Sequence, residues 1–466
     1  MSVARATLRR FGGSRSDWHL IRPSIHRPRP HLGWVGPLAI VATVAVSWLA
    51  FANAQETGTV RLGLYVGAAS IMLMAWSFVL AIRIRLIEPI FDGLDSMYRS
   101  HRWAGSIATA LMFWHTQIEP DVDNGIPGAS RSVADQAQDL AGTGETMIYV
   151  LVGLSLVRWI PYRWWRLTHK LLGVPFAFAC WHFFTAEKPY ANGSGWGVWF
   201  ATFMIVGLVA YVWRIVVRDA VLTGHRYSVH SVETVGSVTT LELAPRSEKL
   251  PHRTGQFVFL KIDHAGLREP HAFTIASSPD AENLRFFIRD LGDWTRTMRA
   301  ADLTGDDVVV EGPYGTFEPF GEPDQLTVWF AGGVGITPFL SAIDSEPLHA
   351  SNPPHLFYAV RFAEDNPIID HLVEADTEGR IVLHLYVSGS GDRLTPEAVR
   401  EVFGDGGLRT AHVGLCGPTS LVDAMERTSR SLGATSVHRE DFDIRQGFGP
   451  DLSLDVADLV GSIRRR

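Results

Sequence analysis

Long apolar stretches concentrate in the first half of the chain. Stretches at 33–53, 62–82, 101–117, 145–160, 167–186 and 195–217 predict a six-helix transmembrane bundle. The third and fourth are shorter than the roughly 20 residues that a bilayer requires. Thirteen of the fifteen tryptophans lie at or before Trp213, as expected for helices whose ends meet lipid headgroups.

After Arg218 the pattern changes to short alternating stretches separated by glycine and proline turns. The segments 227–235, 238–243, 257–262, 284–288 and 308–310 predict an antiparallel β-barrel. From about Gln325, strand-like and helical segments alternate, which predicts an α/β domain. We therefore predict a multi-domain chain with an N-terminal arm at 1–32, a transmembrane domain at 33–218, a β-barrel domain at 222–320, an α/β domain at 321–446 and a C-terminal tail at 447–466.

The basic residues predict the orientation in the membrane. Arginines populate the arm, the loop after the second span and the loop after the fourth, whereas the opposite loops are mainly acidic. The positive-inside rule therefore places the arm and everything after Arg218 in the cytoplasm, in an integral protein of the cytoplasmic membrane. An alternative treats the first span as a signal peptide cleaved near Ala54, although its apolar run is longer than is usual for one.

Charge and cysteine content exclude several function classes. A net charge of −7 argues against nucleic-acid binding, which requires a basic surface. The only two cysteines, Cys180 and Cys416, exclude a cysteine-based zinc or iron–sulfur site.

Four histidines stand out in the apolar half, because no others occur between residues 33 and 217: His101, His115, His169 and His182. His101 and His115 are 14 residues apart, which on a helix is about 21 Å and nearly the same face. His169 and His182 share the fifth span, where we expect a bend at Gly173 and Pro175 to bring them into phase.

Neutral imidazole is a good iron ligand, and ionisable groups inside a bilayer are usually functional. Two histidines on each of two helices predict two stacked haems. Because both spans run outward, His101 pairs with His169 on the cytoplasmic side and His115 with His182 on the outer side. The alternative is that these are interfacial histidines bonded to lipid or water.

A glycine-rich turn follows a predicted strand of the α/β domain. Backbone amides in such a turn approach a pyrophosphate at a helix start, although a tight structural turn is the alternative. The candidate residues are Gly332, Gly333, Gly335, Thr337 and Pro338. Arg361 and Arg393 follow the next two strands and favour NADPH through its 2′-phosphate, unless they are solvated surface residues.

Three further motifs are specific. They are His271-Ala272-Phe273-Thr274, Arg289 followed by Gly292-Asp293-Trp294-Thr295, and Cys416-Gly417-Pro418. Together with the four histidines, they make the stretch from about 60 to 445 resemble the NADPH oxidase and ferric reductase family. In that family a ferric-reductase-like transmembrane haem domain is fused to an FAD- and NAD(P)H-binding, ferredoxin-reductase-like module.

The resemblance assigns roles to these residues. Phe273 would pack near the isoalloxazine, Thr274 would hydrogen-bond it near N5, and His271 would lie toward the FAD pyrophosphate. Arg289 would contact that pyrophosphate, within the FAD element that includes Gly292, Trp294 and Thr295. Cys416, Gly417 and Pro418 would lie beside the nicotinamide, and Phe442 would cover the flavin. Ala272 departs from the family's proline, and without its Gly-Pro neighbours Cys416 would be read as a buried core thiol.

The resemblance implies a transmembrane oxidoreductase with FAD, two b-type haems and NADPH, or NADH, as cofactors. Electrons would pass from cytoplasmic NADPH to an acceptor on the outer side, either oxygen, giving superoxide, or ferric iron. Arg61, at the outer start of the second span, would attract superoxide or orient oxygen, or is an interfacial anchor. Alternatives are an outer partner protein or quinone as acceptor, and a non-enzymatic haem carrier with a nucleotide-sensing domain.

Overall fold

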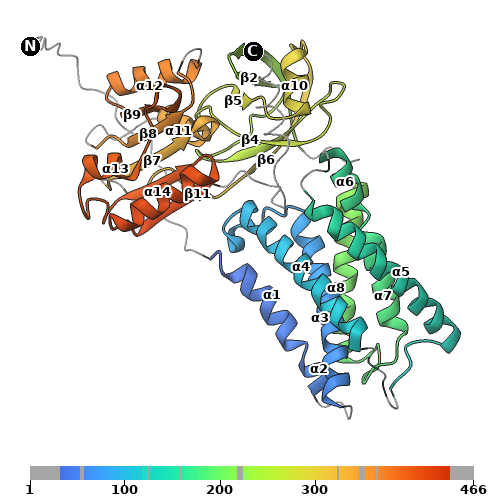
Figure 1. The fold of residues 1–466 in the computed structure, drawn as a ribbon. Helices are drawn as coiled ribbons and strands as arrows, with labels where there is room; N and C mark the ends of the chain where they lie inside the picture. The colour runs from blue at the N-terminus through green and yellow to red at the C-terminus, as the bar shows by residue number, and fades with distance from the viewer. Residues whose placement is uncertain are drawn as a thin grey trace, which may run out of the picture.

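The computed structural model describes residues 32–440 apart from 53–56, 119, 121, 123–124, 158–159, 161, 218–223, 323–324, 346–351 and 364–365. Residues 1–31 of the predicted arm, the predicted tail and Phe442 lie outside the described residues. The first half is a helical bundle, and the second half forms two β-containing modules at one end of it (Figure 1).

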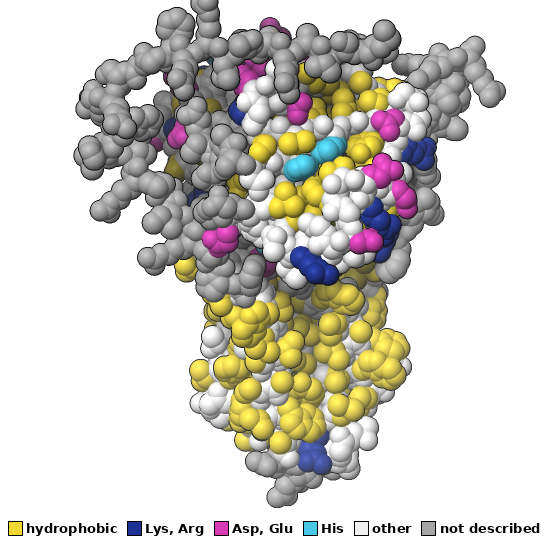
Figure 2. All heavy atoms as spheres, turned by 90° about the vertical axis from the view of Figure 1, so that its left-hand side faces the viewer, with side chains coloured by type: hydrophobic (Ala, Val, Ile, Leu, Met, Phe, Trp, Pro, Cys, Tyr) yellow, Lys and Arg dark blue, Asp and Glu magenta, His cyan; other side chains and the backbone are white. Residues whose placement is uncertain are grey.

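The bundle follows the apolar stretches. Its helices are α1 (Val35–Val46), α2 (Leu49–Ala52), α3 (Gly58–Ala81), α4 (Leu94–Ile118), α5 (Arg131–Leu156), α6 (Tyr162–Lys170), α7 (Gly173–Thr185) and α8 (Gly195–Val212). By length and composition, three described helical segments suffice to cross a membrane: Val35–Ala52, Gly58–Ala81 and Gly195–Ile215. Hydrophobic side chains cover the visible face of the bundle, whereas charged side chains gather mainly on the modules (Figure 2).

The third, fourth and fifth predicted spans differ from the structure in extent. Helices α4 and α5 contain 25 and 26 residues, because polar turns extend the short apolar stretches. The fifth span is two helices, separated by a turn at Leu171 and Leu172. The bend therefore precedes Gly173, and Pro175 lies in the first turn of α7, where proline is tolerated.

The first module is antiparallel and covers residues 224–322. Its strands are β1 (His225–Val235), β2 (Val238–Pro245), β3 (Phe257–Ile262), β4 (His271–Thr274), β5 (Leu284–Arg289) and β6 (Asp307–Tyr314). They form one sheet in the order β4-β3-β6-β1-β2-β5, and α10 (Asp293–Ala300) follows β5. Alternating side chains such as Leu241 and Leu243 are fully buried in its core.

The second module, residues 325–440, has a parallel sheet covered by helices. Its elements are β7 (Thr327–Gly332), η3 (Gly333–Ile336), α11 (Thr337–Ile343), β8 (His355–Val360), α12 (Pro367–Thr377), β9 (Val382–Val387), α13 (Pro396–Phe403), β10 (His412–Cys416), α14 (Thr419–Ser431) and β11 (Ser436–Glu440). The strand order β11-β10-β7-β8-β9 requires crossover connections, as the alternating pattern predicts. All carboxyl ends therefore meet at one edge, where such sheets bind ligands.

The antiparallel module docks on the bundle through a short helix, η1 (Glu88–Phe91), between α3 and α4. The buried carboxylate of Glu88 accepts a hydrogen bond from the Gly315 amide at 2.7 Å. Arg166 of α6 forms an ion pair with Glu269 at 2.8 Å. Phe257 and Phe259 belong to the same hydrophobic cluster as the bundle core, so the two halves share packed surface.

We predict that docking depends on the protonation of Glu88. Burial raises the pKa of Glu88, so the docked state binds this proton more tightly than the undocked state. The contribution of this proton to the stability of the docked state is complete at pH values below the pKa of Glu88 in the undocked state. It is lost as the pH rises through the higher pKa of Glu88 in the docked state. Thermal denaturation in detergent across about pH 4 to 8 should show this loss, and Glu88→Gln should flatten it. If Glu88→Gln shows the same pH dependence of thermal stability as the wild-type protein, Glu88 is not the group that controls docking.

Candidate functional site

The structure brings two of the four bundle histidines next to each other, with their rings edge to face. His101 of α4 and His169 of α6 have ring centroids 5.9 Å apart. We call them the proximal pair, because they lie at the end of the bundle that meets the antiparallel module. The distal pair is His115 of α4 and His182 of α7, which lie within electrostatic range of one another.

Hydrogen bonds fix the proton of the proximal rings on Nδ1. Nδ1 of His101 lies 2.8 Å from the backbone oxygen of Ser77, which can only accept. Nδ1 of His169 lies 2.9 Å from the hydroxyl of Ser155, whose own proton goes to the Leu151 carbonyl at 2.7 Å. Both rings therefore keep the Nε2 lone pair for a metal, the usual outer-shell arrangement of a ligand histidine.

The distal pair is asymmetric. Nδ1 of His115 donates to the Gly63 carbonyl at 2.8 Å, so its Nε2 is also a ligand nitrogen. Gly67 of α3 permits this position, because a Cβ there would lie 2.6 Å from Nδ1 of His115. Nδ1 of His182 is buried and has no hydrogen-bond partner among the described residues.

A cavity of about 290 Å³ opens beside the proximal pair, and both histidines line it. Its apolar wall includes Phe78 and Ile148. Five basic residues also line it: Arg83, Arg102, Arg166, Lys170 and Arg214. Apolar walls, two ligand nitrogens and basic side chains suit a haem with its two carboxylates. Within the described residues no cluster of three or more His, Cys, Asp or Glu could hold a metal ion.

The predicted flavin motif lies on β4, next to α10. His271 stacks on Trp294 with centroids 4.7 Å apart, and Phe273 packs on the same indole at 5.3 Å. Burial lowers the pKa of His271, which favours its neutral form. The buried hydroxyl of Thr274 has no partner within the described part of the chain. An orphaned hydroxyl at this position fits a flavin edge as hydrogen-bond partner.

The second predicted FAD element surrounds the start of α10. Arg289 ends β5 with an exposed side chain, and Gly292 is the N-cap of α10. The hydroxyl of Thr295 accepts from the amides of Leu291 and Gly292, each at 3.0 Å. Thr295 therefore shapes the turn through backbone contacts.

The predicted nucleotide residues gather at the carboxyl edge of the parallel sheet. Gly332 ends β7 and Cys416 ends the neighbouring strand β10, while Thr337 and Pro338 begin α11. A Cβ on Gly335 would lie 2.5 Å from the Cys416 carbonyl, so only glycine lets the turn approach this strand. Gly417 and Pro418 lie against Gly332, which joins the two predicted motifs. Gly333 has a positive φ of 55°, the left-handed region that glycine favours.

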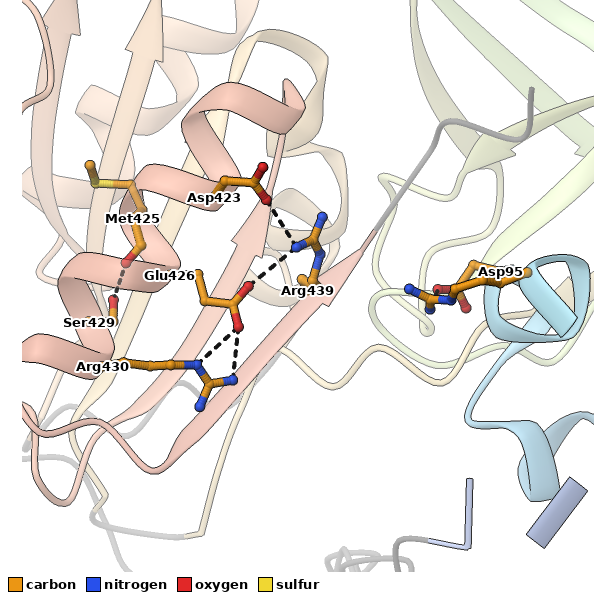
Figure 3. A network of polar contacts seen from close by, with 8 residues as sticks. Asp95, Asp423, Met425, Glu426, Ser429, Arg430 and Arg439 are labelled. Carbon is orange, nitrogen blue, oxygen red and sulfur yellow. Dashed lines mark hydrogen bonds and ion pairs between the residues drawn. The ribbon is translucent and has the colours of Figure 1, made fainter. Parts of the chain in front are cut away.

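The remaining predicted residues lie at the same edge. Arg361 follows β8 and Arg393 follows β9, and both side chains are exposed. The last residue of β11, Glu440, pairs with Cys416 in the parallel register of β10 and β11. Arg439 fixes β11 on α14 through Asp423 at 3.1 Å and Glu426 at 3.3 Å (Figure 3).

Sequence reasoning missed the residues that orient the histidines. Ser77 and Ser155 are polar residues within apolar stretches, and this was the one available signal. Gly63 and Gly67 act through the backbone, which the sequence pattern does not reveal.

Known protein families match parts of both halves of the chain. A family described as "Ferric reductase like transmembrane component" matches residues 66–180, and an FAD-binding domain matches 225–318. Mouse NADPH oxidase 1 is 32% identical over 109 residues, 22% of this chain and 18% of that protein. These matches make the chain similar to the NADPH oxidase and ferric reductase family.

Other relatives match different parts. Human dual oxidase 1 is 26% identical over 186 residues, 36% of this chain and 12% of that protein. The electron transfer component of 2-halobenzoate 1,2-dioxygenase from Burkholderia cepacia is 26% identical over 218 residues, 45% of this chain and 63% of that protein. The alignments with the two oxidases thus span less than a fifth of their lengths. The match to a ferric-reductase-like transmembrane component and the apolar helices indicate that the first half of the chain is a membrane part, and the second half contains an FAD-binding domain.

We predict that haem binds at the distal pair only when position 67 of α3 has no side chain. Gly67→Ala places a methyl group 2.6 Å from Nδ1 of His115, so this ring must move. The expected result is loss of about half of the bound haem, measured by pyridine haemochrome absorbance per chain. Gly153→Ala is the matched control, because a Cβ at this helical glycine meets nothing within 4 Å. Equal haem content in both variants would contradict the placement of His115.

Proposed function

We propose that the chain passes electrons from cytoplasmic NADPH through FAD and two b-type haems to an acceptor on the far side of the membrane. The observation that carries the proposal is the proximal pair, in which two imidazoles from different helices lie edge to face and use Nδ1 for hydrogen bonds, which leaves Nε2 for a ligand. The basic cavity beside them supports haem as the ligand. The family relationship supports the direction from nucleotide to membrane.

The proposed site residues have separate roles. Gly332, Gly333 and Gly335 bind the NADPH pyrophosphate, and Cys416 borders the nicotinamide at the same sheet edge. Thr274 donates its buried hydroxyl to the flavin. Bound FAD supplies the conversion of a two-electron hydride donor into a one-electron donor for haem iron. The four histidines would hold two haems, with two imidazoles for each, and the haems would supply one-electron transfer toward the acceptor.

Two groups near the distal end favour different acceptors. Nη1 of Arg61 donates to the Ala52 carbonyl at 3.1 Å, while its buried Nε has no partner among the residues described. This cation favours oxygen, because it stabilises superoxide as it forms. Glu145 accepts hydrogen bonds from Thr116, which adjoins His115, and from Tyr149. A carboxylate there favours a cationic ferric species instead.

Stopped-flow absorption of purified protein tests the proposal. NADPH without oxygen should reduce both haems, and oxygen or a ferric chelate should then reoxidise them. Faster reoxidation by oxygen, with dismutase-sensitive superoxide, identifies an oxidase, and faster reoxidation by the chelate a metalloreductase. Slow reoxidation by both indicates a partner protein or quinone. Bound nucleotide without any haem reduction would contradict the proposed function.

His115→Ala isolates the distal step. The variant should lose the distal haem spectrum and slow reoxidation by at least about 100-fold, because the outward path is broken. The proximal haem should still be reduced by NADPH. Unchanged haem content and rate would refute the ligand assignment of His115.

We also predict that Arg361 selects NADPH over NADH. Arg361→Ala removes a cation proposed to meet the 2′-phosphate, so the ratio of kcat/KM for NADPH to that for NADH should fall about tenfold or more. Rates of anaerobic haem reduction with each nucleotide give this ratio. Arg409→Ala is a control on the same module, since Arg409 lies before β10 at the opposite, amino end. A ratio unchanged in Arg361→Ala would exclude this role.

A further inference from the structure

Arg83 has an unusual backbone conformation. It lies two residues beyond α3 with a φ of 63°, in the left-handed region, and Asp92 is the only other non-glycine residue with positive φ in the described part of the chain. For a residue with a Cβ, this conformation is strained. Such strain persists when surrounding contacts hold the residue in place, and it often occurs at functional sites.

The guanidinium of Arg83 makes contacts on both sides of the domain boundary. Its carbon lies 3.5 Å from the ring centroid of Phe259, and Nη1 lies 3.9 Å from the Glu311 carboxylate. Both partners belong to the antiparallel module. Nε donates to the hydroxyl of Tyr98, which belongs to α4 of the bundle. The side chain is only 10% exposed, so these contacts hold it in a largely water-free position.

The same side chain lines the cavity beside His101 and His169. Arg166 is the second basic residue that lines this cavity and contacts the module, through Glu269. Arg83 differs from Arg166 in combining a strained backbone, an aromatic contact and an ion pair at one point. It is therefore a physical link between the proximal pocket and the surface on which the module docks.

We infer that Arg83 is a positioning residue that couples the binding of haem in the cavity beside the proximal pair to the docking of the antiparallel module on the bundle. An anionic group in the cavity favours the guanidinium orientation that Phe259 and Glu311 also favour. Binding in the pocket then tightens docking, and docking tightens binding by the same factor. The inference rests on the proposed function, because it takes haem as the occupant of the pocket.

Hydrogen exchange of the full chain in detergent tests the coupling. The reporter is the Gly315 amide, which donates to Glu88 across the docking surface. Haem-loaded and haem-depleted protein are compared by mass spectrometry of the peptide that covers residues 311–316. We expect exchange at Gly315 to be on the order of tenfold slower in the loaded protein.

Two substitutions remove the guanidinium in different ways. Arg83→Gln keeps the backbone strain, whereas Arg83→Gly relieves it and so preserves folding. Both should abolish the haem-dependent difference in exchange at Gly315. Arg99→Gln is the matched control, because Arg99 pairs with Asp95 and Ser96 within α4 and does not line the cavity. This control should retain the full difference.

The outcomes separate the inference from the function on which it rests. If wild-type protein binds haem with a bis-histidine spectrum but Gly315 exchange does not respond, the coupling is refuted and the proposed function stands. A difference that persists in both Arg83 variants refutes the role of Arg83. Absence of a bis-histidine haem in wild-type protein overturns both.

Discussion

The structure depends on the orientation of imidazole rings inside an apolar bundle. A ring in such a place must satisfy one nitrogen by hydrogen bonding and present the other to a ligand. The bundle meets this condition at three of the four histidines, through Ser77, Ser155 and Gly63. Because these partners lie on α3 and α5, the packing of α4 and α6 against those helices determines where the free imidazole nitrogens lie.

A second constraint is the contact between the bundle and the antiparallel module. Electron transfer between cofactors held in different domains requires those domains to be fixed relative to one another. The structure fixes them with a buried carboxylate at Glu88, an ion pair at Arg166 and shared aromatic packing at Phe259. Arg166 lines the proximal cavity, and Phe259 packs on Arg83, which also lines it. The domain boundary and the proposed haem site therefore share side chains.

The sequence predicted the features that depend on periodicity and on residue type. The four histidines, the change from long apolar stretches to alternating strands, and the glycine turn after β7 are visible without coordinates. The turn between α6 and α7 lies at Leu171 and Leu172, before the predicted bend at Gly173 and Pro175. Pro175 does not cause the turn, because it fits the first turn of α7. Arg83 lies in the arginine-rich loop after the second predicted span, and the sequence pattern uses it only to predict the orientation in the membrane. Its partners Phe259 and Glu311 are distant in sequence. Contacts of that kind depend on the tertiary arrangement, which local patterns do not encode.

We propose that the two histidine pairs each hold one haem iron. Low-temperature electron paramagnetic resonance of the oxidised, purified chain tests it most directly, because bis-imidazole ligation gives low-spin ferric iron. We expect two low-spin signals, of which Gly67→Ala removes one and leaves the other. A high-spin signal as the main species, or a single haem per wild-type chain, would contradict it.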